Sequence, residues 1–195
     1  MTISLLEDFI EATDKLDATG SSGSTNPRVD GAGGLVEIRT GAANGNYRQL
    51  QTKSKNVDPR FSPIFSAYLR TKDTTYLETF IGLADGDAGS AQNLIGFYRS
   101  DAGSAGSWQR RFRINNGTPD NQDLLVPGTT NFIEMMAQVS VTEVSFFLNG
   151  RLVRVDTSNF PTTVTNLMYF VLWIKATSAS ERTLVVDYAQ LTASR

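Results

Sequence analysis

Two aspartates in one glycine-rich segment are the residues of this chain best placed to bind a metal ion. Asp85 and Asp87 flank Gly86, and Gly89 follows. Carboxylate and backbone oxygens are the ligands that calcium prefers, but the glutamate that closes an EF-hand loop is missing. A segment rich in Asp and Gly is more often a plain turn. We therefore expect no bound cofactor, and calcium at Asp85 and Asp87 is the alternative.

The absence of histidine and cysteine removes several kinds of catalysis. The 195 residues contain neither type. The chain therefore has no thiolate nucleophile, no zinc site built from Cys or His, and no Ser-His-Asp triad.

Arginines and a tryptophan gather in one segment. Trp108 is followed by arginines at positions 110, 111 and 113. In a strand, Arg111 and Arg113 share one face, and Trp108 shares the other with Phe112. An exposed Trp beside arginines suits a sugar ring, an acidic glycan or a protein partner, so Trp108, Arg111 and Arg113 are candidate ligand-binding residues. The alternative is an edge strand whose charges prevent unwanted pairing.

Three further aromatic residues could line a ligand site. Tyr47 follows the loop at 41–46 and is a candidate of the same kind as Trp108. Tyr169 and Trp173 lie in the apolar run 167–175, where such residues could line a groove, form the core or face another subunit.

The charge and apolar patterns exclude two classes of partner. The chain has 18 basic and 20 acidic side chains, a net charge of −2, and a pI near 5.2. A nucleic-acid module normally carries a basic face, so no nucleic acid is expected. The longest apolar run, 167–174, is far shorter than the roughly 20 residues of a membrane helix, and the first residues lack the pattern of a secretory signal. No membrane partner is expected either.

Short alternating segments predict an all-β fold. Alternation of apolar and polar residues, with turn residues between the segments, recurs from Phe61 onward. Asn149-Gly150 predicts a two-residue hairpin turn that sets Phe146 opposite Val153. The run 167–175 is apolar on both faces, which is typical of a central strand. Together these features predict two packed antiparallel sheets in a jelly-roll sandwich.

The N-terminal segment has two interpretations. Ser4 and Glu7 form a capping box that predicts a helix over 5–17, and the alternative is an extended arm that adds an edge strand. We expect residues 1–20 to be this arm or helix, part of the same unit as a single β-sandwich domain over 21–195. One apolar side must then dock on the body or on a partner, and its candidate partner-binding residues are Leu5, Leu6, Phe9 and Ile10.

The order of these segments resembles the concanavalin A-like (laminin G-like) jelly roll, in the form common among bacteriophage virion proteins. The matching parts span most of the chain: Glu7-Asp8-Phe9, 34–38, 65–69, 79–83, Phe97-Tyr98-Arg99, 146–150 and 186–191. The resemblance implies a virion structural protein, as a capsid decoration or a head or tail fibre module. Its partners would be neighbouring virion proteins, and it would form a homo-oligomer, for which a trimer is the common form. It would be made in the host cytoplasm and reside in the virion. The alternative that the resemblance implies is a lectin-like module for host-surface glycans.

The acidic residues depart from the hydrolases that share this fold. Those enzymes carry alternating Glu, Asp and Glu on one strand, so that two carboxylates share a sheet face. Here Glu78 stands alone in its segment, and a turn separates Glu134 from Glu143. We therefore expect that the chain is not an enzyme.

Overall fold

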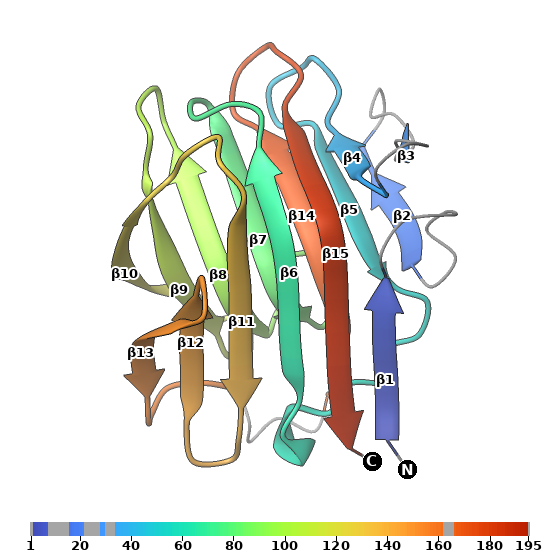
Figure 1. Cartoon of the computed structure of the whole chain (residues 1–195), viewed down its shortest axis with the longest axis vertical. Coiled ribbons are helices and arrows are strands. Elements are labelled where there is room, and N and C mark those ends of the chain that lie inside the picture. The colour runs from blue at the N-terminus through green and yellow to red at the C-terminus, as the bar shows by residue number, and fades with distance from the viewer. Residues whose placement is uncertain (1, 8–15, 22–27, 30–33, 162–165, 195) are drawn as a thin grey trace.

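Two antiparallel β-sheets lie face to face around one core (Figure 1). The computed structural model describes residues 2–7, 16–21, 28–29, 34–161 and 166–194. In these ranges the regular structure consists of strands and one 3-10 turn, η1 (Pro59–Phe61). The expected two-sheet jelly-roll sandwich is confirmed. No helix in these ranges is long and apolar enough to cross a membrane.

The larger sheet has eight strands. Its path in space runs through β13 (Arg151–Asp156), β12 (Val144–Leu148), β11 (Ile133–Val139), β6 (Ile64–Thr71), β15 (Thr183–Ser194), β4 (Val36–Arg39) and β3 (Arg28–Val29). The eighth strand, β1 (Thr2–Glu7), pairs with β15. In Figure 1 this sheet is the layer nearer the viewer.

The second sheet has seven strands. Its order is β10 (Asp120–Pro127), β9 (Ser107–Arg113), β8 (Leu94–Asp101), β7 (Leu77–Ala84), β14 (Tyr169–Ala176), β5 (Tyr47–Thr52) and β2 (Leu16–Gly20). The apolar run at 167–175 therefore forms a central strand, as expected, because β14 lies between β7 and β5.

Aromatic side chains from both sheets interlock in the core. Phe97 of β8 meets Phe146 of β12 at 5.1 Å between ring centroids and 86° between ring planes. Phe65 of β6 meets Phe97 at 6.5 Å and 87°. Edge-to-face contacts of this kind add to the free energy gained by burying the rings. They fix the two layers against each other, and so determine which residues of each strand face outward.

The N-terminal segment is extended where the structure describes it. Residues 2–7 form β1, which pairs with β15 from Thr2 opposite Ser194 to Glu7 opposite Ala189. Residues 16–20 form β2, which pairs with β5 in the other sheet. Of the two interpretations, the extended arm is therefore correct for 2–7 and 16–20. The helix over 5–17 is wrong at both of its ends, because backbone pairing with two sheets replaces the local capping signal. Residues 8–15 lie outside the described ranges.

The hairpin of β12 and β13 turns at the expected residues. Asn149 and Gly150 have φ values of 49° and 73°, as a two-residue type I′ turn requires. Phe147 lies opposite Leu152, but an irregularity then sets Phe146 opposite Arg154 instead of Val153. The predicted register is thus correct next to the turn and wrong beyond a β-bulge.

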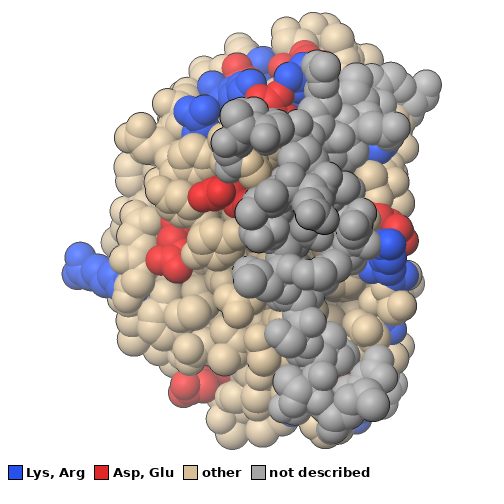
Figure 2. All heavy atoms as spheres, turned by 45° about the vertical axis from the view of Figure 1, so that its right-hand side comes forward, with Lys and Arg blue, Asp and Glu red and all other residues tan. Residues whose placement is uncertain are grey.

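Ion pairs join strands at one end of the sandwich. Glu37 of β4 pairs with Arg39 and Lys72, and Arg39 Nη1 lies 3.8 Å from Glu181 Oε1. Burial raises the pKa of Glu37, but hydrogen bonds from Lys72 and Arg39 outweigh it and leave that pKa below its ordinary value. Figure 2 likewise shows basic and acidic side chains next to each other at the upper end of that view.

Candidate functional site

Aromatic and charged side chains gather on the outer face of the seven-stranded sheet, the face that points away from the core. Strand alternation places Glu78 and Phe80 of β7 on this face, because Ile81 and Leu83 face inward. Phe80 lies opposite Trp173 of β14 on one side and opposite Tyr98 of β8 on the other. A row of aromatic residues therefore crosses the middle of the sheet.

The loop between β7 and β8 covers part of this row. Trp173 is only 2% exposed, and Phe80, Tyr98, Ala88 and Ala91 are buried with it. The backbone N–H of Ala88 donates to Gln49 Oε1 of β5 at 3.0 Å, which fixes the loop across the sheet. The indole Nε1 of Trp173 has no hydrogen-bond partner among the described residues.

The uncovered part of the outer face carries a charged pair. Glu78 lies opposite Lys175 of β14, and Lys175 Nζ donates to Glu78 Oε2 at 3.3 Å. Ser100 of β8 lies opposite Glu78 on its other side, and Tyr47 of β5 lies opposite Lys175. All four side chains are at least partly exposed. The pair thus sits beside a hydroxyl and a phenol, in reach of a molecule resting on the sheet.

Arg111 borders this region from β9. Its guanidinium carbon lies 3.1 Å from the centroid of the Tyr98 ring, and its Nε donates to Asn121 Oδ1 at 2.8 Å. Burial of the guanidinium lowers the pKa of Arg111. A cation stacked on an aromatic face can still donate hydrogen bonds from its edge, so Arg111 remains suited to an acidic or hydroxyl-rich ligand.

Arg113 mainly holds loops together. Its Nη1 donates to the carbonyl of Ala91 at 2.9 Å, its Nε to the carbonyl of Gly117 at 2.9 Å, and its Nη2 to Asn116 Oδ1 at 2.8 Å. Arg113 thus shares the outer face with Arg111, as expected, but its donors are already used by the protein.

Tyr47 lies at the edge of the aromatic row. Its ring centroid is 6.5 Å from that of Trp173. A hydrogen bond with Asp87 and burial both raise the pKa of the Tyr47 hydroxyl. Tyr47 is therefore a neutral phenol held in place by the loop between β7 and β8.

Trp108 is not where the sequence analysis expected it. It is 2% exposed and packs in the core between the sheets with Phe112. The guanidinium of Arg99, also buried, lies 5.8 Å from the Trp108 ring. The predicted grouping of Trp108 with Phe112 is correct, but that face points inward, so Trp108 cannot stack on an external ligand.

Asp85 and Asp87 fasten their own loop. Asp85 Oδ1 accepts the backbone N–H of Gln92 at 2.9 Å, and Asp87 Oδ1 accepts that of Gly89 at 2.7 Å. Within the described ranges, no three acidic side chains gather in a way that could hold a metal ion. Asp85 thus holds backbone groups of its own loop, and Asp87 does so as well as binding the hydroxyl of Tyr47.

The four docking candidates are only partly placed. The backbones of Leu5 and Leu6 lie in β1, opposite Leu191 and Gln190 of β15. Phe9 and Ile10 fall outside the described residues. Their role in docking stays a prediction.

Lys175 and Ser100 are site residues that the sequence analysis missed, and Glu78 appeared there only as an acidic residue that stands alone in its segment. They come from three strands, and only the pairing of β8 with β7 and of β7 with β14 brings them together. The outward position of Glu78 could be inferred from local alternation. The positions of Lys175 and Ser100 beside it could not.

Comparison by sequence finds no matching family and no matching curated protein. Many solved structures share the fold. A pseudo β-1,3-glucanase and immunostimulatory antigen of Mycobacterium tuberculosis has a TM-score of 0.70 at 10% identity, over 98% of both chains. A Crh5 transglycosylase in complex with NAG has a TM-score of 0.71 at 16% identity, over 98% of this chain and 84% of that one. A CBM2 module of the evolved Dit protein of Lactobacillus casei phage J-1 has a TM-score of 0.63 at 10% identity, over 98% and 96%.

These likenesses correct one expectation. Several of the similar structures are named glucanases, glycosyl hydrolases or transglycosylases, which contradicts the expectation that this chain is not an enzyme. That expectation rested on the missing alternation of acidic residues, yet Glu78 lies on the central strand of the outer face. The chain has the concanavalin A-like jelly-roll fold that these glucanases, transglycosylases and the phage module share.

Proposed function

We propose that this chain binds a carbohydrate on the outer face of its seven-stranded sheet. The observation that carries the proposal is the Glu78–Lys175 pair lying between Ser100 and Tyr47, with Arg111 at the border. The ligand is an oligosaccharide that lies across the strands at this point.

The chemistry of a sugar fits these residues. Hydroxyl groups both donate and accept hydrogen bonds, and bonds to ionised partners such as Glu78 and Lys175 are the stronger kind. The C–H face of a sugar ring is apolar and packs on an aromatic side chain, for which the partly buried rings of Tyr47 and Tyr169 are available. A site with a few placed polar groups on an aromatic surface is typical for small ligands.

The similar structures support the same class of ligand. One was solved as a complex with NAG, and another is named a CBM2 module. Two more are named a β-1,3-glucanase and a β-1,3-1,4-glucanase. These names give the probes for a test: oligosaccharides of β-1,3-glucan, of β-1,3-1,4-glucan and of NAG.

Isothermal titration calorimetry of the full chain with these three probes tests the proposal. At least one probe should bind, and Glu78→Gln should weaken that binding about tenfold, because an ionised acceptor is lost. Glu143→Gln, in the exposed turn between β11 and β12, is the matched control and should bind as the wild type does. The same mixtures are assayed for new reducing ends, since named glucanases share the fold. Failure of all three probes to bind, or unchanged binding by Glu78→Gln, would contradict the proposed site.

We further propose that the chain is a module of a phage particle and contacts neighbouring virion proteins. The resemblance of its sequence implies this role, and the likeness to a module of a phage Dit protein supports it. Mass spectrometry of purified particles tests it directly. The chain should be found in stoichiometric amount with the known particle proteins, and its absence from the particles would refute this role.

A further inference from the structure

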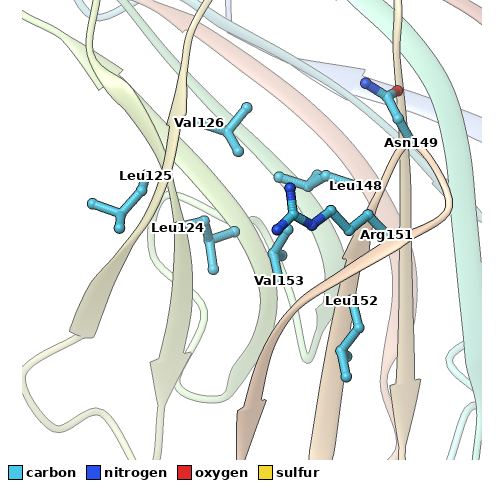
Figure 3. Close-up of a pocket in the computed structure, with 8 residues that line it drawn as sticks. All are labelled: Leu124, Leu125, Val126, Leu148, Asn149, Arg151, Leu152 and Val153. Atoms are coloured by element: carbon cyan, nitrogen blue, oxygen red, sulfur yellow. The ribbon is translucent and has the colours of Figure 1, made fainter.

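An apolar hollow opens at one side of the sandwich, between the free edges of both sheets. Strand β10 ends the seven-stranded sheet and β13 ends the eight-stranded sheet, and neither has a further strand beside it within the described ranges. The hollow between them has a volume of about 350 Å³. Figure 3 shows the residues that line it: Leu124, Leu125, Val126, Leu148, Asn149, Arg151, Leu152 and Val153.

A leucine beside this hollow is held out into solvent. The pairing of β10 with β9 is interrupted between Asp123 and Val126, so Leu125 has no partner in the ladder. Leu125 is 85% exposed and has a φ of 59°, a value that leucine rarely adopts. In Figure 3 it points away from the hollow, while Leu124 and Val126 point toward it. An exposed apolar side chain on a strained bulge is evidence that this edge has a use beyond the isolated fold.

The two edge strands also carry charges of opposite sign. Asp123 of β10 is exposed, and one of its carboxylate oxygens accepts the backbone N–H of Leu125 at 2.6 Å. Arg151 of β13 is exposed, has no ion-pair or hydrogen-bond partner among the described residues, and extends across the hollow in Figure 3. The edge strand β10 therefore presents a carboxylate, and the edge strand β13 presents a guanidinium without a partner among the described residues.

We propose that this side of the sandwich is the interface with a second copy of the same chain. A two-fold axis that runs along the strands, between the two edges, sets β10 of each copy opposite β13 of the other. Such a contact is isologous, so the protruding group and the hollow that receives it must lie on the same surface, as Leu125 and the hollow do. The same operation brings Asp123 of each copy toward Arg151 of the other. The proposed interface therefore contains each contact twice: Leu125 in the hollow of the other copy, and Asp123 beside Arg151 of the other copy.

Sedimentation equilibrium of the full chain over a wide range of concentration tests this proposal. The wild type should associate reversibly to a dimer. Leu125→Asn should be monomeric, because the apolar group is gone, and it should unfold at a temperature equal to or higher than the wild type, since Asn tolerates a positive φ. Arg151→Glu should weaken the dimer at least tenfold, and the effect should shrink as salt is raised.

The matched control is Val141→Asn, which removes another exposed apolar side chain, in the turn between β11 and β12. This variant should dimerise as the wild type does. A wild type that stays monomeric at every concentration, or that forms a trimer, overturns the proposal and leaves the hollow to a different protein partner. A Leu125→Asn variant that dimerises normally overturns it too. Carbohydrate binding is measured on the same variants and should not change, because the hollow lies at the sheet edges and the proposed sugar site does not include them.

Discussion

Glu78 and Lys175 face each other across the pairing of β7 with β14, with 3.3 Å between Oε2 and Nζ. Their side chains are 24% and 34% exposed, so water screens the pair, and such pairs contribute at most about 1 kcal/mol to stability. Two long side chains held together on an open sheet face thus do little for the fold. In the proposed function their role is to form hydrogen bonds with a sugar, together with Ser100 and Tyr47 beside them.

Lys175→Met should therefore separate binding from stability. The free energy of unfolding should change by less than about 1 kcal/mol, because a screened pair is lost and the aliphatic part of the side chain is kept. Affinity for the oligosaccharide that the wild type binds should fall about tenfold. Urea denaturation and calorimetry on the same preparation give both values. A variant that loses stability and affinity together would indicate a structural role for Lys175.

Asp101→Asn should destabilise the fold strongly. Asp101 pairs with Arg99 two residues before it, both side chains are almost fully buried, and the backbone N–H of Gly106 also donates to Asp101. Removing one partner leaves a buried charge unpaired, which costs about 3–5 kcal/mol. Urea denaturation measures this loss. Asp73→Asn breaks the more exposed pair with Arg182 and should cost less than about 1 kcal/mol. Equal effects of the two substitutions would mean that the Arg99 pair is not sealed from water.

Gly128→Ala should be destabilising for a related reason. A Cβ at position 128 would overlap the guanidinium of Arg99, which is fully buried and paired with Asp101. Such overpacking costs about 1–3 kcal/mol. Gly86→Ala is the control, since a Cβ there meets nothing within 4 Å. Thermal unfolding of both variants checks the prediction, and a fully stable Gly128→Ala protein would show that Arg99 can shift.

Tyr188 should ionise later than an ordinary tyrosine. Burial and a hydrogen bond from its hydroxyl to Glu134 Oε1, at 2.9 Å, raise its pKa from about 10 to about 12. The folded state thus keeps a proton that the unfolded state releases above pH 10. This contribution to stability is complete below about pH 10 and is lost as the pH rises through about 12.

Ultraviolet titration of the six tyrosines should resolve this group. One phenol should titrate near pH 12 in the wild type, and that step should be missing in Tyr188→Phe. A Tyr188→Phe variant whose titration keeps the step near pH 12 would show that this step belongs to another tyrosine.

Local alternation was enough to predict most of the strands, and the run 167–175 could be recognised as a central strand because it is apolar on both faces. The turn at Asn149-Gly150 could also be predicted, because a type I′ turn needs a positive φ at two adjacent residues and Asn-Gly favours it. The bulge that sets Phe146 opposite Arg154 could not, because it depends on the partner strand. The choice between helix and extended arm at the N-terminus could not be made for the same reason. The capping residues are a local signal, whereas the pairing of β1 with β15 and of β2 with β5 depends on distant strands.

The candidate site was predictable only in part. Arg111 and Tyr47 lie on the outer face, where a ligand can reach them. The alternation in β9 grouped Trp108 with Phe112 correctly, but it did not reveal that this face points into the core. Lys175 is 97 positions from Glu78 in the chain, and no sequence pattern links the two. A site assembled across strands becomes visible only when the register of the sheet is known.

The ladder that sets Thr2 opposite Ser194 brings the two ends of the described chain to one spot, as Figure 1 shows. Adjacent strands are about 4.8 Å apart, so this whole sandwich could be inserted into a surface loop of another protein without moving the two ends of that loop far apart. For the same reason a short peptide could join the two ends, and new ends could be opened elsewhere, for example at the exposed turn after Leu148.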